Sequence, residues 1–198
     1  MINITVAQKI CASANEIAEV LLNHAQLGRF FNAQISLVKP ENEGAIKGGQ
    51  GAVRHITIGK MTFEEEIINA SYHHICYQII GNKPVANHQG DIYLNTEYRT
   101  NDLPTISANN NHEVNHNNPS QLTHLEHSED NTGLTNTDFT KQSYTQVNYV
   151  IEFNGLVWLP DLFLKFLVKR DISLAMQRLA NYFTKQQLLR KSNRESYL

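Results

Sequence analysis

The sequence predicts an α+β domain in which an antiparallel sheet is covered by a long C-terminal helix, with two short helices after the first strand. Segments of alternating apolar and polar residues, joined by turns, indicate hairpin-connected strands. After Gly155 the apolar spacing changes to that of a helix. An apolar sheet face needs a cover, and this helix is the only large apolar element left to provide it.

The N-terminal segment begins with a strand and continues into the two short helices. Apolar residues alternate over residues 2–6, which predicts a half-buried strand. Ser13 and Glu16 match a capping box, so we expect a helix to begin there and to bury residues 17–22 at helical spacing. A second short helix is expected over residues 24–31, and alternation returns over residues 33–37.

The next segment predicts a hairpin whose register can be written down. Residues 52–58 and 61–70 flank Gly59-Lys60, and glycine first in a two-residue loop suits a type II′ turn. This turn places Arg54 opposite Glu65 on an otherwise apolar face. The other predicted pairs are Ile58 with Met61, Ile56 with Phe63, Thr57 with Thr62, His55 with Glu64, and Val53 with Glu66.

Three more strands and the C-terminal helix complete the pattern. The strands are expected over residues 73–80, 85–97 and 143–153. The helix carries an apolar stripe that is interrupted by a predicted break near residues 169–171. The stripe comprises Leu159, Leu162, Phe163, Phe166 and Leu167 before the break, and Ile172, Ala175, Met176, Leu179, Tyr182 and Phe183 after it.

The predicted domain spans residues 1–190 and is interrupted by an insert between two strands. This insert, residues 98–142, contains nine Asn and four His and carries a net charge of −4. Because it cannot bury enough apolar surface to offset its ordering entropy, we expect it to be disordered. Its histidines lack the spacing of a structural metal site. Residues 191–198 are expected to form a flexible basic tail.

Composition and motifs exclude several classes of protein. The net charge of −2 and the pI of about 6.5 argue against nucleic acid as a partner. Only two cysteines occur, and the N-terminus shows no signal pattern, so a cytoplasmic location is expected. No motif typical of a phosphate, dinucleotide or zinc site is found, so we expect no cofactor and no metal. Oligomeric state is left open.

An ordered set of loose motifs is similar to a known superfamily. The set comprises Gly51-x-x-Arg54, Gly59, Phe63-x-Glu65-x-Ile67, Tyr77-x-Ile79, Pro84-x-x-Asn87-x-x-Gly90 and the terminal residues 179–183. Over residues 1–97 and 143–187 the chain resembles the START-like (SRPBCC) superfamily, in particular its bacterial polyketide cyclase/dehydrase and lipid-transport-like group. The resemblance implies a helix-grip fold, in which a curved sheet grips the C-terminal helix around an apolar cavity. The insert replaces a short turn of these relatives.

Arg54 and Glu65 are the first candidates for a site in this cavity. One interpretation is a polar anchor that binds a ligand carboxylate or orients a carbonyl group. The alternative is a structural cross-strand ion pair, in which each side chain offsets the cost of burying the other's charge. In the first case Glu65 is also a candidate for acid-base catalysis.

The other candidates are aromatic or apolar residues, among which Tyr93 has the parity of Asp91 and Asn95. His88 shares the parity of Ile92, which allows a general base or a hydrogen-bonded strand histidine. The aromatic side chains with polar atoms can line a cavity or simply pack in the core; they are Tyr77, Tyr93, Tyr149 and Trp158. Ile56, Phe63 and Phe166 complete the predicted ligand-binding set.

The sequence leaves three classes of function open. The leading hypothesis is a carrier or binding protein for a hydrophobic small molecule such as a lipid, a quinone or a polyketide-like compound. The second is a cyclase or dehydratase that uses His88 or the Arg54–Glu65 pair. The third is a protein-interaction module without a ligand. The basic residues from Lys165 onward are compatible with transient membrane contact, or with a solvated helix face.

Overall fold

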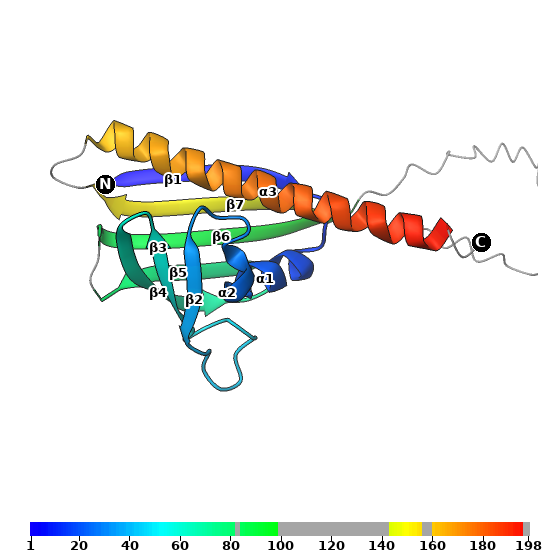
Figure 1. Cartoon of the computed structure of the whole chain (residues 1–198), viewed down its shortest axis with the longest axis horizontal. Coiled ribbons are helices and arrows are strands. Elements are labelled where there is room, and N and C mark those ends of the chain that lie inside the picture. Colours follow the sequence, from blue (N-terminus) through cyan, green and yellow to red (C-terminus); the bar gives the residue numbers. More distant parts are fainter. Residues whose placement is uncertain (82–83, 99–142, 156–159, 196–198) are drawn as a thin grey trace, which may run out of the picture. The chain divides into compact units, whose positions relative to one another are not determined.

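A single antiparallel sheet of seven strands dominates the structure (Figure 1). The computed structural model describes residues 1–81, 84–98, 143–155 and 160–195. The strands are β1 (Ile2–Ile10), β2 (Gln34–Lys39), β3 (Val53–Ile58), β4 (Met61–Ala70), β5 (His74–Ile80), β6 (Ala86–Tyr98) and β7 (Ser143–Asn154). Their order in the sheet is β1-β7-β6-β5-β4-β3-β2, so every pair except β1–β7 joins neighbours in the sequence. The predicted fold class is confirmed.

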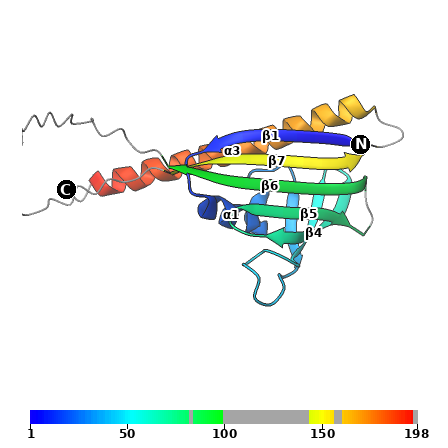
Figure 2. The same cartoon turned by 180° about the vertical axis from the view of Figure 1, so that it is seen from behind.

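One face of the curved sheet is covered by helix α3 (Asp161–Glu195). In Figure 1 this helix crosses in front of β1 and β7, and the reverse view in Figure 2 shows it behind the same strands. Two short helices, α1 (Ala14–Leu22) and α2 (His24–Leu27), connect β1 to β2 along the chain. Helix α2 ends at Leu27, earlier than the predicted residue 31, and turns lead on to β2.

The core is built from the inward faces of the sheet, α1 and α3. The Ser13–Glu16 capping box begins α1 as predicted: the Glu16 backbone N–H donates to the Ser13 hydroxyl, and the Ser13 backbone N–H donates to the Glu16 carboxylate. Along β1 and β7, buried side chains alternate with more exposed ones, so every second side chain points into the core. The largest fully buried side chains include Ile4, Ile10, Ile17, Leu94, Met176 and Leu179.

Helix α3 is continuous, and the predicted break near residues 169–171 is absent. The inward face contains Leu164, Val168 and Ile172 at intervals of four residues, and it continues into the buried residues Ala175, Met176, Leu179 and Phe183. Leu162, Phe163 and Phe166 are therefore on the opposite side, where they are 83%, 52% and 63% exposed. The prediction that these three side chains face the core was wrong, because it assumed a break that is absent; Leu167 is half-buried, and Leu159 lies outside the described residues.

The hairpin β3–β4 has the predicted register throughout, from Val53 opposite Glu66 to Ile58 opposite Met61. Gly59 has a φ of +58°, which the first position of a type II′ turn requires. Arg54 and Glu65 therefore lie opposite each other, and both are buried. The turn chemistry alone determines which side chains face the core.

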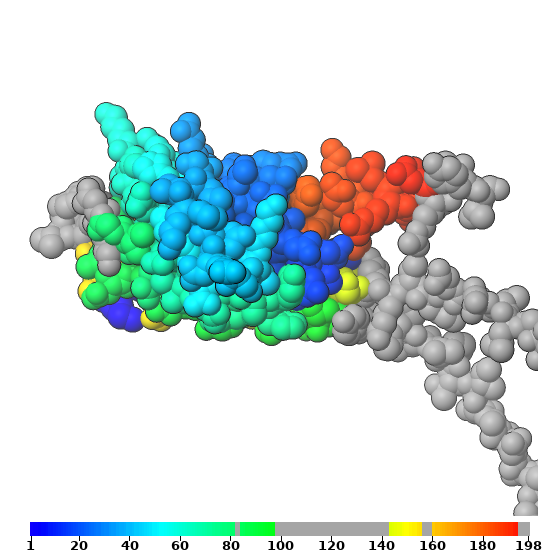
Figure 3. All heavy atoms as spheres, turned by 90° about the horizontal axis from the view of Figure 1, so that it is seen from below, coloured from blue at the N-terminus to red at the C-terminus, as the bar shows by residue number. Residues whose placement is uncertain are grey.

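The glycine-rich loop between β2 and β3 is held against α2 by a buried histidine. The Nε2 atom of His24 donates a hydrogen bond to the Gly48 carbonyl oxygen at 2.8 Å. Gly48 has a φ of +71°, and a Cβ atom there would lie 2.1 Å from the Leu22 carbonyl oxygen, so only glycine fits. Figure 3 shows this loop, in light blue and cyan, beside the blue α1–α2 segment.

Some predictions fall at or beyond the limits of the described residues. Residues 99–142 of the predicted insert lie outside them, as does Trp158. Residues 191–195 belong to α3, although the sequence pattern assigned them to a flexible tail. Across the described ranges, no helix is long and apolar enough to span a membrane.

Candidate functional site: a cavity between the sheet and α3

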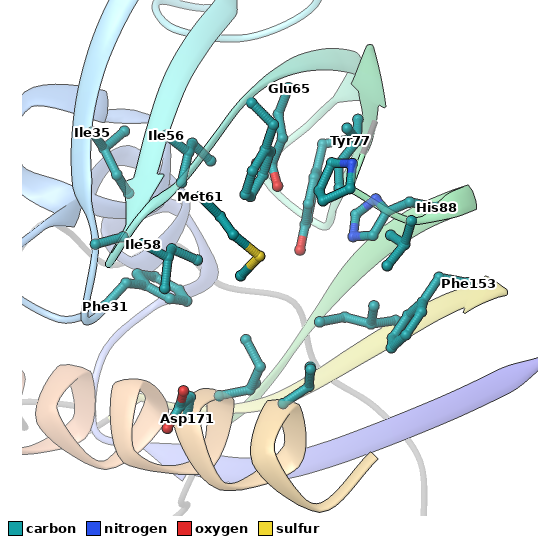
Figure 4. Close-up of a pocket in the computed structure, with 18 of the residues that line it drawn as sticks. Phe31, Ile35, Ile56, Ile58, Met61, Glu65, Tyr77, His88, Phe153 and Asp171 are labelled. Atoms are coloured by element: carbon teal, nitrogen blue, oxygen red, sulfur yellow. The ribbon is translucent and has the colours of Figure 1, made fainter. Parts of the chain in front are cut away.

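A cavity of about 240 Å³ lies between the inner face of the sheet and helix α3 (Figure 4). Strands β3 to β7 form one wall, and Leu164, Val168, Asp171 and Ile172 of α3 form the other. The segment from α2 to β2 closes a third side. Exposed side chains at the β3–β4 turn, including Met61, lie at the rim. The walls are mainly apolar and polar groups are few, as in ligand-binding cavities.

Most of the predicted site residues line this cavity. They are Arg54, Ile56, Phe63 and Glu65 from the first hairpin, Tyr77 from β5, His88 from β6 and Tyr149 from β7. Phe166 does not, because the phase of α3 turns it toward solvent. Tyr93 lies on the outer face of the sheet, where its ring stacks on His74 at a centroid distance of 4.6 Å.

Arg54 and Glu65 form a buried ion pair at the base of the cavity. The Arg54 Nε and Nη2 atoms both approach Oε2 of Glu65, at 2.8 and 2.7 Å. Burial raises the pKa of the Glu65 carboxyl, and the Arg54 guanidinium counteracts that rise. Burial is the largest single influence on Arg54 and lowers its pKa, but Glu65, Tyr77 and Tyr149 together outweigh burial, so the pKa of Arg54 is raised. The pairing predicted from the turn is thus present.

Two tyrosines extend this polar base across the sheet. The hydroxyls of Tyr77 and Tyr149 are hydrogen-bonded to each other, and the Arg54 guanidinium lies 4.9 Å from the centre of the Tyr77 ring. A Cβ atom at Gly90 would lie 2.2 Å from the Tyr77 ring, so glycine on β6 makes room for this tyrosine. Burial raises the pKa of Tyr149 to about 12 and that of Tyr77 well above its usual value.

His88 stands beside the tyrosines, at an irregular point of β6. The register between β6 and β7 shifts between Ala86 and Gln89, and His88 lies within this bulge. Its ring centre lies 5.6 Å from that of Tyr77 and 6.4 Å from that of Phe153. Its Nδ1 atom is buried and has no hydrogen-bond partner among the described residues. Burial, and then the nearby positive charge of Arg54, lower the pKa of His88 to about 4.

The α3 wall and most of the α2–β2 side were not predicted from the sequence. Leu164, Val168 and Ile172 recur every four residues, and counting back from Leu179 in an unbroken helix would have found them. Phe31 and Ile35 reach the cavity because the chain bends between α2 and β2, and no local pattern indicates this. No cluster of side chains suited to a metal ion is found in the part of the chain that the structure describes.

Acid conditions are expected to destabilise the protein through the buried His24 and the half-buried His88. Burial is also the main cause that lowers the pKa of His24 to about 4, whereas an unfolded histidine titrates near 6.5. The unfolded state therefore binds more protons between these values, so the free energy of unfolding falls as the pH drops from 6.5 toward 4. The loss is at most about 3 kcal/mol for each histidine.

Denaturant titrations across this pH range will test the expectation. Replacing His88 by Gln should flatten the dependence of the unfolding free energy on pH, because the site no longer titrates. The matched control is His73→Gln, at an exposed histidine directly before β5. An unchanged slope in His88→Gln would contradict the assignment of His88 as a half-buried side chain whose pKa is lowered.

Comparison with solved structures supports the fold over nearly the whole chain. The protein XoxI from Bacillus cereus is 14% identical, with a TM-score of 0.55, and the match covers 94% of this chain and 99% of XoxI. An uncharacterized protein from Bacillus thuringiensis is 15% identical, with a TM-score of 0.52 and coverage of 92% and 99%. The Aha1 dimer from Colwellia psychrerythraea is 13% identical, with a TM-score of 0.52 and coverage of 92% and 96%.

These likenesses concern the fold, because identity is low in every case. No protein-family model matches the sequence, and no curated protein matches it. A shared fold of this kind hosts unrelated functions, so any function has to be argued from the cavity itself.

Proposed function

We propose that the protein binds an apolar small molecule in the cavity between the sheet and α3, as a carrier or binding protein of the START-like type. The supporting observation is the cavity itself: apolar side chains of five strands and α3 surround it, and its few polar side chains lie mainly at the base, with Asp171 on the α3 side. Lipids, quinones and polyketide-like compounds bring the apolar surface that such walls bury favourably. An interaction module would not need this space.

A cyclase or dehydratase is the alternative use of the same cavity. It would need an acid-base group placed to transfer a proton. His88 and Glu65 both line the cavity, but Glu65 is held by Arg54, and the Nδ1 atom of His88 is buried without a partner among the described residues. This arrangement favours binding over catalysis.

Binding of N-phenyl-1-naphthylamine, an uncharged dye that fluoresces in apolar sites, will test the proposal. We expect saturable binding of one dye per chain. Val168→Trp places an indole in the cavity from the α3 wall and should weaken binding by about tenfold or more. The control Gln177→Trp adds the same indole on the exposed side of α3 and should bind like wild type.

Circular dichroism melts will first show that both variants are folded. The dye is excited where indole does not absorb, so the introduced tryptophans do not disturb the reading. Absence of saturable dye binding to wild type would contradict the proposed function. Equal binding by Val168→Trp and wild type would show that the dye lies elsewhere.

A further inference from the structure

The charged side chains around the cavity offer no excess of positive charge to an acidic ligand. Among the described lining residues they are Arg54, Glu65 and Asp171, one cation against two anions. Figure 4 shows Glu65 and His88 on the sheet side and Asp171 across the cavity on α3. Asp171 also contacts Arg170 at 3.0 Å, on the exposed side of the helix. A ligand carboxylate would therefore meet a surface that does not attract it.

The one cation among these described lining residues is already bound. Arg54 directs both Nε and Nη2 to a single oxygen of Glu65, at hydrogen-bonding distance, and both side chains are buried. A ligand carboxylate would have to lose its hydration and also compete with Glu65 for the guanidinium. Burying a charge without a partner of its own is among the most costly steps in binding. The cavity therefore disfavours anions even though an arginine lines it.

An uncharged oxygen finds partners at the same place. The hydrogen bond between the Tyr77 and Tyr149 hydroxyls uses one of their two protons, so this pair keeps one donor. Glu65 accepts the two Arg54 contacts through Oε2, and its Oε1 atom takes part in neither. A carbonyl oxygen can accept from the tyrosine pair, and a hydroxyl can also donate to the carboxylate. Neither group carries a charge that must be buried.

We propose that this cavity selects apolar ligands whose polar group is an uncharged carbonyl or hydroxyl oxygen, and that it rejects the corresponding carboxylates. The inference rests on the proposed function, since it assigns a ligand class to the same cavity. Arg54 and Glu65 then act together as a neutral unit, and the pair discriminates against charge. This differs from an arginine that anchors an acidic ligand, which the sequence alone left open.

Competition between two compounds of matched shape will test the inference. 2-Acetonaphthone and 2-naphthoate share a ring system; the first carries a methyl ketone at the position where the second carries a carboxylate. Each will displace N-phenyl-1-naphthylamine from the full chain at neutral pH, with naphthalene as the probe without oxygen. The ketone should bind about tenfold tighter than the carboxylate and measurably tighter than naphthalene. Equal or tighter binding of 2-naphthoate, or ketone binding no tighter than naphthalene, would overturn the inference.

Removing the compensating charge should reverse the preference. Glu65→Gln keeps the size of the side chain but leaves the Arg54 charge unpaired, so 2-naphthoate should gain about tenfold while the ketone changes little. Asp171→Asn, at the half-buried rim, should give a smaller gain in affinity for 2-naphthoate. This variant provides the test if Glu65→Gln fails to fold. Asp161→Asn, which changes an exposed acid of the same helix, should leave the affinity for 2-naphthoate unchanged.

The outcomes separate the two proposals. If the dye binds but the ketone shows no advantage over the carboxylate, the cavity is a binding site and the inferred selectivity is wrong. The same conclusion follows if Asp171→Asn and Glu65→Gln both leave the affinity for 2-naphthoate unchanged. If the dye itself does not bind, the proposed function fails and the inferred selectivity fails with it.

Discussion

Arg54→Met is expected to lower the free energy of unfolding by about 3–5 kcal/mol. The substitution leaves the Glu65 carboxylate buried beside Tyr77 without the two contacts that Arg54 makes to its Oε2 atom. It also removes the guanidinium 4.9 Å from the centre of the Tyr77 ring. Urea titration monitored by circular dichroism will measure the change.

The double variant Arg54→Met, Glu65→Leu should recover much of that loss, since no unpaired charge remains inside. The matched control is Lys9→Met, which breaks the exposed pair of Lys9 and Glu97, held at 2.9 Å. That change should cost no more than about 1 kcal/mol. A loss in Arg54→Met no larger than in Lys9→Met would show that burial of the pair has been misassigned.

Ending the chain at Gly155 is expected to abolish cooperative folding. Helix α3 supplies Met176, Leu179 and Phe183 to the core, each worth about 1.5–3 kcal/mol of buried surface. Their sum is comparable to the total stability of a typical domain, about 5–15 kcal/mol. The inner faces of β1 and β7 would also become exposed. We expect an insoluble product or a compact state without fixed packing, which proton NMR and urea titration will distinguish from a native fold.

A shorter truncation provides the control. Ending the chain after Gln187 removes the exposed Leu188 and Leu189 and the exposed Arg190–Glu16 pair, so the protein should keep a cooperative transition. A soluble fragment of residues 1–155 that unfolds cooperatively would refute the role of α3 as the cover of the sheet.

The elements that the sequence predicted well are those set by short-range chemistry. The type II′ turn at Gly59 determined the register of six residue pairs, and with it the burial of Arg54 opposite Glu65. The capping box at Ser13 placed the start of α1. In both cases neighbouring residues decide the geometry, so the pattern can be read without knowledge of the tertiary structure.

The first half of α3 was harder to predict, because apolar residues occur on more than one side of it. Phe166 and Val168 are both apolar and could each belong to the core. Only counting back from the buried Leu179 in an unbroken helix shows that Val168 is on the inward face. His88, in contrast, was placed by its parity with Ile92, although it lies where the register between β6 and β7 shifts. The charge balance of the cavity required the three-dimensional structure, since Asp171 lies far from Glu65 in the sequence.

The most direct test of the central claim is native mass spectrometry of the full chain purified from its host without detergent. If the cavity holds an apolar, uncharged molecule, the wild type will carry one additional small mass that organic extraction removes, and Gln177→Trp will carry it too. Val168→Trp, with the cavity filled from the α3 wall, will be detected without that mass. An additional mass retained by Val168→Trp, or a wild type that is always free of ligand, would contradict the claim.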